Sequence, residues 1–120
     1  MTNKEIERKA IKEAIKYEKQ KKRKPEEVRQ GKGYDIISSG RKIEVKGVGR
    51  KNPGWVSFQH NCFNALQEEK KYFVYIVKIP KVGRPEIIYV IPRKDIFRHL
   101  RLKMVWEIAL PVGEMLKWKK

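Results

Sequence analysis

The chain has few of the residues that cross-link a protein or hold a zinc ion. Its 120 residues include one cysteine, Cys62, and two histidines, His60 and His99. A single cysteine excludes an internal disulfide framework and fits a reducing cytoplasm, and three such scattered residues do not make a zinc site. At this length we expect one domain, over residues 1–120, built around a modest hydrophobic core.

Acidic residues are scarce relative to basic ones, and long apolar runs are missing. The chain has 30 Lys and Arg against 14 Asp and Glu, which gives a formal net charge of +16 at pH 7. Such a field favours polyanionic partners, namely DNA, RNA or an anionic membrane surface. Because no apolar run reaches membrane-spanning length and the N-terminus lacks a signal-peptide core, we expect no membrane association and a cytoplasmic location. Nucleic acid is the better partner.

One segment, residues 33–47, has the pattern of a two-stranded hairpin. Residues 34–38 run outward, Ser39-Gly40 supplies a two-residue turn, and residues 41–46 run back. The turn fixes the register between the two strands, and the register decides which side chains meet across them.

The register places Asp35 opposite Glu44, with Cβ atoms roughly 5 Å apart. Lys46 points to the same face as Glu44, whereas Ile43 and Val45 point to the other face, into a core. Like charges opposite one another destabilise a sheet, but a divalent cation between them reverses the sign of that interaction. This favours a metal site. The alternative is a solvated strand face with a Glu44–Lys46 contact.

Helical and strand patterns alternate along the rest of the chain. We expect helices over residues 3–22, 59–71 and 93–102, and further strands over 55–58, 72–79, 86–91 and 104–110. A polar connection is expected over 26–32 and a glycine-rich loop over 47–54. This order predicts an α/β domain with a central mixed sheet flanked by helices.

Glu18 continues the apolar face of the first predicted helix. Ile11, Ala14, Ile15 and Glu18 follow the i, i+3, i+4, i+7 spacing. An acidic residue on that face is a candidate site residue. The alternative is an ordinary surface glutamate paired with Lys22 at i+4.

Four motifs carry a resemblance to a known family. They are Ala14-Ile-Lys-Tyr-Glu18 followed by Pro25, then Gly33-Tyr-Asp-Ile-Ile-Ser38, then Ile43-Glu-Val-Lys-Gly47, and then Asn61 to Ala65 before a tyrosine-rich strand. Together they resemble the PD-(D/E)xK nuclease superfamily, and more closely the domain named after the C-terminus of the plant NO VEIN protein, grouped with Mrr-like restriction endonuclease folds. The resemblance covers roughly residues 10–92. It implies a restriction endonuclease-like core with the order αβββαβ.

The resemblance also implies roles for individual residues. Asp35 and Glu44 would bind the metal, with the backbone carbonyl of Val45 as a further ligand. Lys46 would be the catalytic lysine, and Glu18 would support the metal or its water. The ion would be Mg²⁺ or Mn²⁺, since two carboxylates bind a hard cation and leave positions for water and a phosphate oxygen. The expected enzyme is a Mg²⁺-dependent endodeoxyribonuclease.

One position departs from the family pattern. Members often open the second helix with an Asn-Glu pair, where this chain has Asn61-Cys62. This departure favours one alternative, a non-catalytic nucleic-acid-binding module on a nuclease fold. A second alternative is a Holliday-junction resolvase, because the archaeal resolvases are similarly short, basic and dimeric and resemble this chain in the order of Asp and Glu-x-Lys. Asn61 itself is expected to cap the second helix. A single nuclease domain usually cuts one strand, so cleavage of both strands would require a homodimer.

Basic residues near the predicted site are candidate DNA contacts. They occupy the end of the first helix and the loop after the hairpin, and are Lys22, Arg23, Lys24, Arg50 and Lys51, together with the aromatic residue Trp55. Because no base-reading motif is recognisable, we expect recognition of the DNA backbone or shape.

Overall fold

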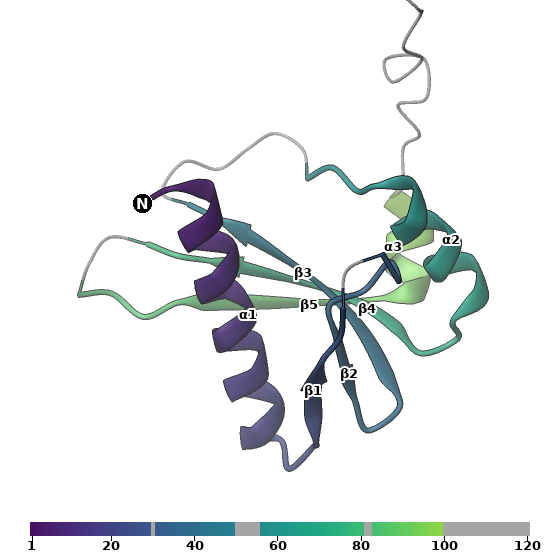
Figure 1. Ribbon diagram of the computed structural model, residues 1–120, viewed down its shortest axis with the longest axis horizontal. Helices are drawn as coiled ribbons and strands as arrows, with labels where there is room; N and C mark the ends of the chain where they lie inside the picture. Colours follow the sequence, from purple (N-terminus) through teal and green to yellow (C-terminus); the bar gives the residue numbers. More distant parts are fainter. Residues whose placement is uncertain (30, 50–55, 81–82, 100–120) are drawn as a thin grey trace, which may run out of the picture.

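The computed structural model describes residues 1–29, 31–49, 56–80 and 83–99. Within these ranges lie three helices, α1 (Asn3–Gln20), α2 (His60–Glu68) and α3 (Arg93–His99). They flank one sheet of five strands, β1 (Pro25–Glu27), β2 (Ile36–Ser38), β3 (Arg41–Val48), β4 (Tyr72–Lys78) and β5 (Ile87–Pro92). The strands lie side by side in chain order (Figure 1). Because β3 and β4 are parallel and the other pairs antiparallel, the predicted mixed α/β fold is confirmed.

Local hydrogen bonds fix both ends of α1. Thr2 caps its start, where the Thr2 hydroxyl accepts a hydrogen bond from the Glu5 amide at 3.1 Å. At its end Lys22 adopts a left-handed φ of 60°, and the Arg23 amide donates to the Glu18 carbonyl at 3.0 Å. This Schellman closure turns the chain back, so that Arg23 comes to lie beside Glu18. In the described ranges, no helix is long and apolar enough to cross a membrane.

The predicted hairpin forms with the predicted register. Ile36 pairs with Ile43 across β2 and β3. The two turn residues, Ser39 and Gly40, have φ values of 47° and 84°. Two consecutive positive φ values are what a type I′ turn requires, and this turn matches the twist of the strands that it joins.

The sheet has two differently covered faces. On one face α1 packs against side chains from β2, β3 and β4, in a cluster of buried residues that comprises Ala10, Ile11, Ala14, Ile36, Ile43, Val45, Tyr75, Val77 and Ile79. On the other face α2 and α3 pack against β4, in a smaller cluster that comprises Ala65, Leu66, Tyr72, Val74 and Ile96. Figure 1 shows α2 and α3 together at the end of the sheet where β4 begins. The remaining part of that second face is therefore not covered by these two short helices.

One strand prediction was wrong, although the αβββαβ order holds. Residues 56–58 form no strand, and Trp55 lies outside the described residues, as does the strand predicted over 104–110. The third strand before α2 is instead β1, which pairs with β2 at the sheet edge. Proline and two glutamates are poor strand formers, so their sequence gave no signal, and an edge position is where a proline can be tolerated.

Gly33 sets the approach of α2 to the hairpin. Its φ is 85°, and a Cβ added there would lie 2.2 Å from the carbonyl oxygen of Asn61. Gly31 has a similar φ of 99°, but nothing lies within 4 Å of its added Cβ. Substitutions at the two glycines therefore distinguish the cost of backbone strain from the cost of a steric clash.

Gly33→Ala should lower the free energy of unfolding by about 3 kcal/mol, because it combines a strained φ with overpacking against a helix backbone. Gly31→Ala should cost only about 1 kcal/mol, from the strained φ alone. Urea denaturation of both variants measures the difference. Equal losses of stability in the two variants would mean that the close packing of Gly33 against α2 does not contribute to the free energy of unfolding.

Candidate metal centre

Asp35 is fixed at the point where β2 begins. Its amide donates to the Ile43 carbonyl at 2.8 Å, and its carbonyl accepts from the Val28 amide at 2.9 Å. One carboxylate oxygen, Oδ2, accepts a hydrogen bond from the Val45 amide at 2.7 Å. Since β2 pairs with β3 only from Ile36 to Ser38, this side chain supplies the acceptor that a longer β2 would have provided. The same carboxyl also contacts the Glu44 carboxyl.

Glu44 lies next to Asp35 and is only 6 % exposed. Burial, followed by a hydrogen bond with the neighbouring Asp35 carboxyl and the charge of that group, raises the pKa of the Glu44 carboxyl to about 8. The Cys62 thiol donates to Glu44 Oε2 at 2.7 Å, and Lys46 Nζ lies 3.8 Å from the same oxygen. The cross-strand carboxylate pair predicted from the register is therefore present, with the predicted lysine beside it.

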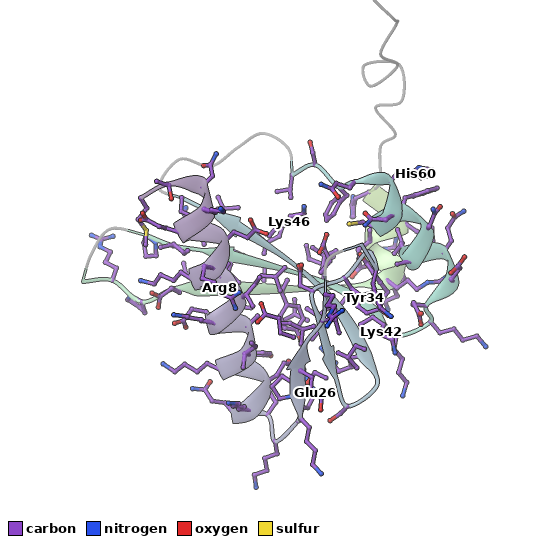
Figure 2. All side chains as sticks on the ribbon, in the orientation of Figure 1. Arg8, Glu26, Tyr34, Lys42, Lys46 and His60 are labelled. Atoms are coloured by element: carbon purple, nitrogen blue, oxygen red, sulfur yellow. The ribbon has the colours of Figure 1, made fainter. Side chains whose placement is uncertain are left out.

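Lys46 is held between an acid and an aromatic ring. Its Nζ lies 5.3 Å from the centroid of the Phe58 ring, which is a cation–π distance. Phe58 itself packs against the smaller cluster under α2. Figure 2 shows Lys46 in the upper half of the molecule, far from Glu26 on β1.

Cys62 and Tyr72 are site neighbours to which sequence reasoning gave no role in binding. Burial, followed by the contact with Glu44, raises the pKa of the Cys62 thiol to about 12, so the thiol keeps its proton. Burial likewise raises the pKa of Tyr72, whose hydroxyl donates to the Gly33 carbonyl at 2.7 Å. Tyr72 is two residues before Val74, the partner of Glu44 in the parallel ladder, and therefore shares its face. Strand alternation could have identified it, but only with the β3–β4 register known.

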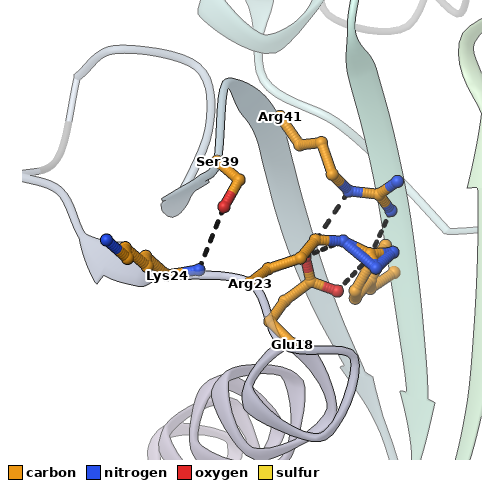
Figure 3. A network of polar contacts seen from close by, with 6 residues as sticks. Glu18, Arg23, Lys24, Ser39 and Arg41 are labelled. Carbon is orange, nitrogen blue, oxygen red and sulfur yellow. Dashed lines mark hydrogen bonds and ion pairs between the residues drawn. The ribbon is translucent and has the colours of Figure 1, made fainter.

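Glu18 belongs to a different network, on the α1 side of the sheet. Its carboxylate is fully buried, and Tyr75 donates to Oε2 at 2.6 Å. Arg23 Nε and Arg41 Nε lie 3.1 and 3.4 Å from Oε1, as ion pairs rather than aligned hydrogen bonds (Figure 3). The Arg41 guanidinium also stacks on the Phe73 ring, 3.8 Å from its centroid. The alternative of a surface Glu18–Lys22 pair was wrong.

Strand alternation separates Glu18 from the carboxylate pair. Arg41 shares the face of Ile43 and Val45, which pack under α1, while Glu44 and Lys46 point to the opposite face. The structure therefore does not bring Glu18 to the metal position that the family resemblance implied for it. Over the described ranges, no group of three or more His, Cys, Asp and Glu side chains could hold a metal ion.

The remaining donor set still fits a magnesium-like cation. Mg²⁺ is usually held by one or two carboxylates, with waters and substrate phosphates filling its other positions. The Asp35 and Glu44 carboxylates could supply two such ligands. In a strand, the N–H and the C=O of one residue point to the same side. The Val45 carbonyl therefore lies on the side of β3 where the Val45 amide donates to Asp35. A bound cation would also offset the repulsion between the two carboxylates.

The predicted DNA contacts are only partly described. Arg50, Lys51 and Trp55 lie outside the described residues. Lys22, Arg23 and Lys24 lie beside the hairpin turn, where the Lys24 amide donates to Ser39 Oγ at 3.1 Å (Figure 3). Arg23 is engaged with Glu18. This group adjoins the start of β3, three residues or about 10 Å along the strand from Glu44.

The start of α2 also differs from the prediction. The residue before the helix is Gln59, whose side chain makes no capping hydrogen bond, so the assignment of Asn61 as the cap was wrong. Asn61 Oδ1 is buried without a hydrogen-bond partner in the described structure.

These features define a mixed α/β domain with a buried carboxylate pair and a lysine on one face of its sheet. The family model described as Protein NO VEIN, C-terminal matches residues 6–90, which is more than half of the chain. The chain therefore belongs to the NO VEIN C-terminal domain family. No curated protein and no solved structure matches it.

If Glu18 is structural, replacing it should cost stability. Glu18→Gln should lower the free energy of unfolding by about 3 kcal/mol, because it leaves the charges of Arg23 and Arg41 without a buried counter-ion. Tyr75→Phe, which removes one hydrogen bond from the same network, should cost about 1 kcal/mol. Urea denaturation measures both. If Glu18→Gln leaves stability unchanged but abolishes Mg²⁺ binding, Glu18 belongs to the metal site and not to a structural network.

Proposed function

We propose that this chain is a metal-dependent DNA endonuclease with a restriction endonuclease-like core. The observation that carries the proposal is the contact between Asp35 and the buried Glu44, with Lys46 Nζ 3.8 Å from the Glu44 carboxylate. Two adjacent carboxylates destabilise a fold on their own, and burial increases that cost. A divalent cation would stabilise a site that keeps the two carboxylates together. The lysine beside them can offset negative charge on a phosphodiester.

Each residue of the site has a separate task in this proposal. Asp35 and Glu44 hold Mg²⁺ or Mn²⁺, with the Val45 carbonyl as a third protein ligand. The bound cation supplies Lewis-acid polarisation of the phosphodiester and lowers the pKa of a water. Lys46 orients or deprotonates the attacking water and offsets negative charge that develops on the phosphate. The Phe58 ring restricts where the Lys46 ammonium can lie.

The charge of the chain supports DNA as the substrate. A net charge of +16 favours a polyanion, and phosphate contacts made by Lys and Arg carry no sequence information. Recognition is therefore of the backbone or shape of the DNA, with Lys22, Lys24 and the residues of the loop after β3 as contacts. Cleavage of both strands would need a homodimer.

Asp35→Asn tests the metal site with little change of fold. The asparagine oxygen can still accept from the Val45 amide, but the negative charge is lost. We expect Mg²⁺-dependent nicking of supercoiled plasmid to fall by at least about 100-fold, with DNA binding in EDTA retained. Mg²⁺ should raise the melting temperature of the wild type and not of the variant.

Asp95→Asn on α3 is the matched control, since it makes the same substitution away from the site. It should cut and bind as the wild type does. Equal nicking by Asp35→Asn and wild-type protein would remove Asp35 from the reaction. A panel of flap, single-stranded and four-way-junction DNA separates a general endonuclease from a Holliday-junction resolvase.

One observation favours a second candidate, a non-catalytic nucleic-acid-binding module. The Cys62 thiol donates a hydrogen bond to Glu44 at 2.7 Å, so one of the two ligand carboxylates is already partly satisfied without a cation. Salt-sensitive DNA binding that persists in EDTA, with no cleavage of any substrate in Mg²⁺ or Mn²⁺, would establish this module instead.

A further inference from the structure

The face of the sheet that carries the carboxylate pair has an exposed aromatic residue on its edge strand, β5. Tyr89 on β5 is 50 % exposed, and its neighbour on the same face, Ile87, is 45 % exposed. Strand β5 lies at the edge of the described sheet. Exposed aromatic and aliphatic side chains on one strand, two strands away from a charged site, form a surface that the proposed chemistry does not use.

The strand registers show that Tyr89 and the site share one face. Lys46 pairs with Ile76 across β3 and β4, and Ile76 pairs with Tyr89 across β4 and β5. Residues opposite one another in a sheet point to the same side. Lys46, Ile76 and Tyr89 therefore form one row across the sheet, about 10 Å from end to end.

The rows on either side confirm this assignment. The row before it contains Glu44, Val74 and Ile91, and both apolar members pack under α2 and α3. The row after it contains the buried Val48, then Lys78 and Ile87. Alternate β5 residues lie on the other face, where Ile88 packs against the α1 cluster. The surface around Tyr89 is thus bordered by the site on one side and by a second lysine on the other.

The aromatic ring and the two lysines match one chemical class of partner. We propose that Tyr89 is a stacking platform for an unpaired base of single-stranded DNA, whose backbone lies along Lys46 and Lys78. Every base offers a π-face for stacking, and the lysines neutralise the phosphates. The bases of a duplex are stacked on one another, so a side chain on a sheet surface reaches only unpaired ones.

The spacing agrees with a single strand that continues from the site. A rise of about 3.4 Å per stacked nucleotide places the Tyr89 ring roughly three nucleotides, or fewer in an extended strand, from a phosphate at Lys46. The platform would therefore hold the strand beside the bond to be cut. This deepens the proposed function, on which it rests for the position of the reacting phosphate, by naming single-stranded DNA as the preferred substrate class.

The test uses the full chain and two substitutions of one residue. Tyr89→Leu keeps apolar bulk but removes the ring, and Tyr89→Phe keeps the ring. Binding of fluorescein-labelled dT20 and of a 20-base-pair duplex is measured by anisotropy in EDTA. We expect Tyr89→Leu to weaken dT20 binding by at least about fivefold, with Tyr89→Phe within twofold of the wild type and duplex binding unchanged.

Phe97→Leu is the matched control, because Phe97 is a 40 % exposed aromatic residue on α3. It should bind dT20 as the wild type does. Unchanged dT20 binding by Tyr89→Leu would overturn the proposal, and so would an equal loss for the duplex. A concentration-dependent dimer that Tyr89→Leu dissociates would also overturn it, since the surface would then be a contact between two copies.

The two proposals fail in different ways. Binding in EDTA tests the platform without any reaction, whereas nicking in Mg²⁺ tests the carboxylate pair. Loss of dT20 binding in Tyr89→Leu alongside a wild-type protein that cuts nothing would keep the platform and reject the nuclease.

Discussion

The alternation of side chains along β3 is the constraint on which the rest of the structure depends. Ile43 and Val45 point under α1 and help to build the larger core, while Glu44 and Lys46 point to the opposite face. A shift of one residue would bury the charged pair under α1 and expose the apolar one. The type I′ turn at Ser39 and Gly40 excludes that shift, because it fixes which residues of β2 and β3 face each other.

The same strand links stability to the candidate chemistry through Asp35. Its carboxylate satisfies the Val45 amide, which no residue of β2 reaches. An aspartate at this point has a structural reason to exist before any metal is considered. The interpretation as a metal site depends instead on Glu44, because burying a second carboxyl next to the first has no such structural benefit. Contacts with Lys46 and Cys62 reduce the free-energy cost of burying Glu44, and a bound cation would reduce that cost further.

Sequence reasoning succeeded where the determinants are local and failed where they are tertiary. The hairpin register follows from a two-residue turn and period-2 alternation, so Asp35, Glu44 and Lys46 could be placed together in advance. Helical spacing correctly put Glu18 on the buried face of α1. It could not tell which face of the sheet α1 covers, because that depends on the order of strands that are distant in sequence.

Tyr72 and Cys62 were missed as site neighbours for the same reason, because their contacts are tertiary. Tyr72 reaches the site only through the parallel β3–β4 register, and Cys62 only through the docking of α2 near Gly33, which a Cβ at that glycine would block. Neither contact leaves a periodic signal in the chain.

The two networks of buried charge divide the sheet into a structural side and a candidate reactive side. On the α1 side Glu18 meets two arginines and a tyrosine hydroxyl, so its charge is balanced within the chain. On the other side Glu44 meets one lysine and a second carboxyl, and the pKa of Glu44 is raised to about 8 because the two acids cannot both ionise at low cost. In a chain of net charge +16, an adjacent pair of acids is an exception to the general composition. Perturbed acids of this kind concentrate at functional sites, and a cation is the partner that we propose for this pair.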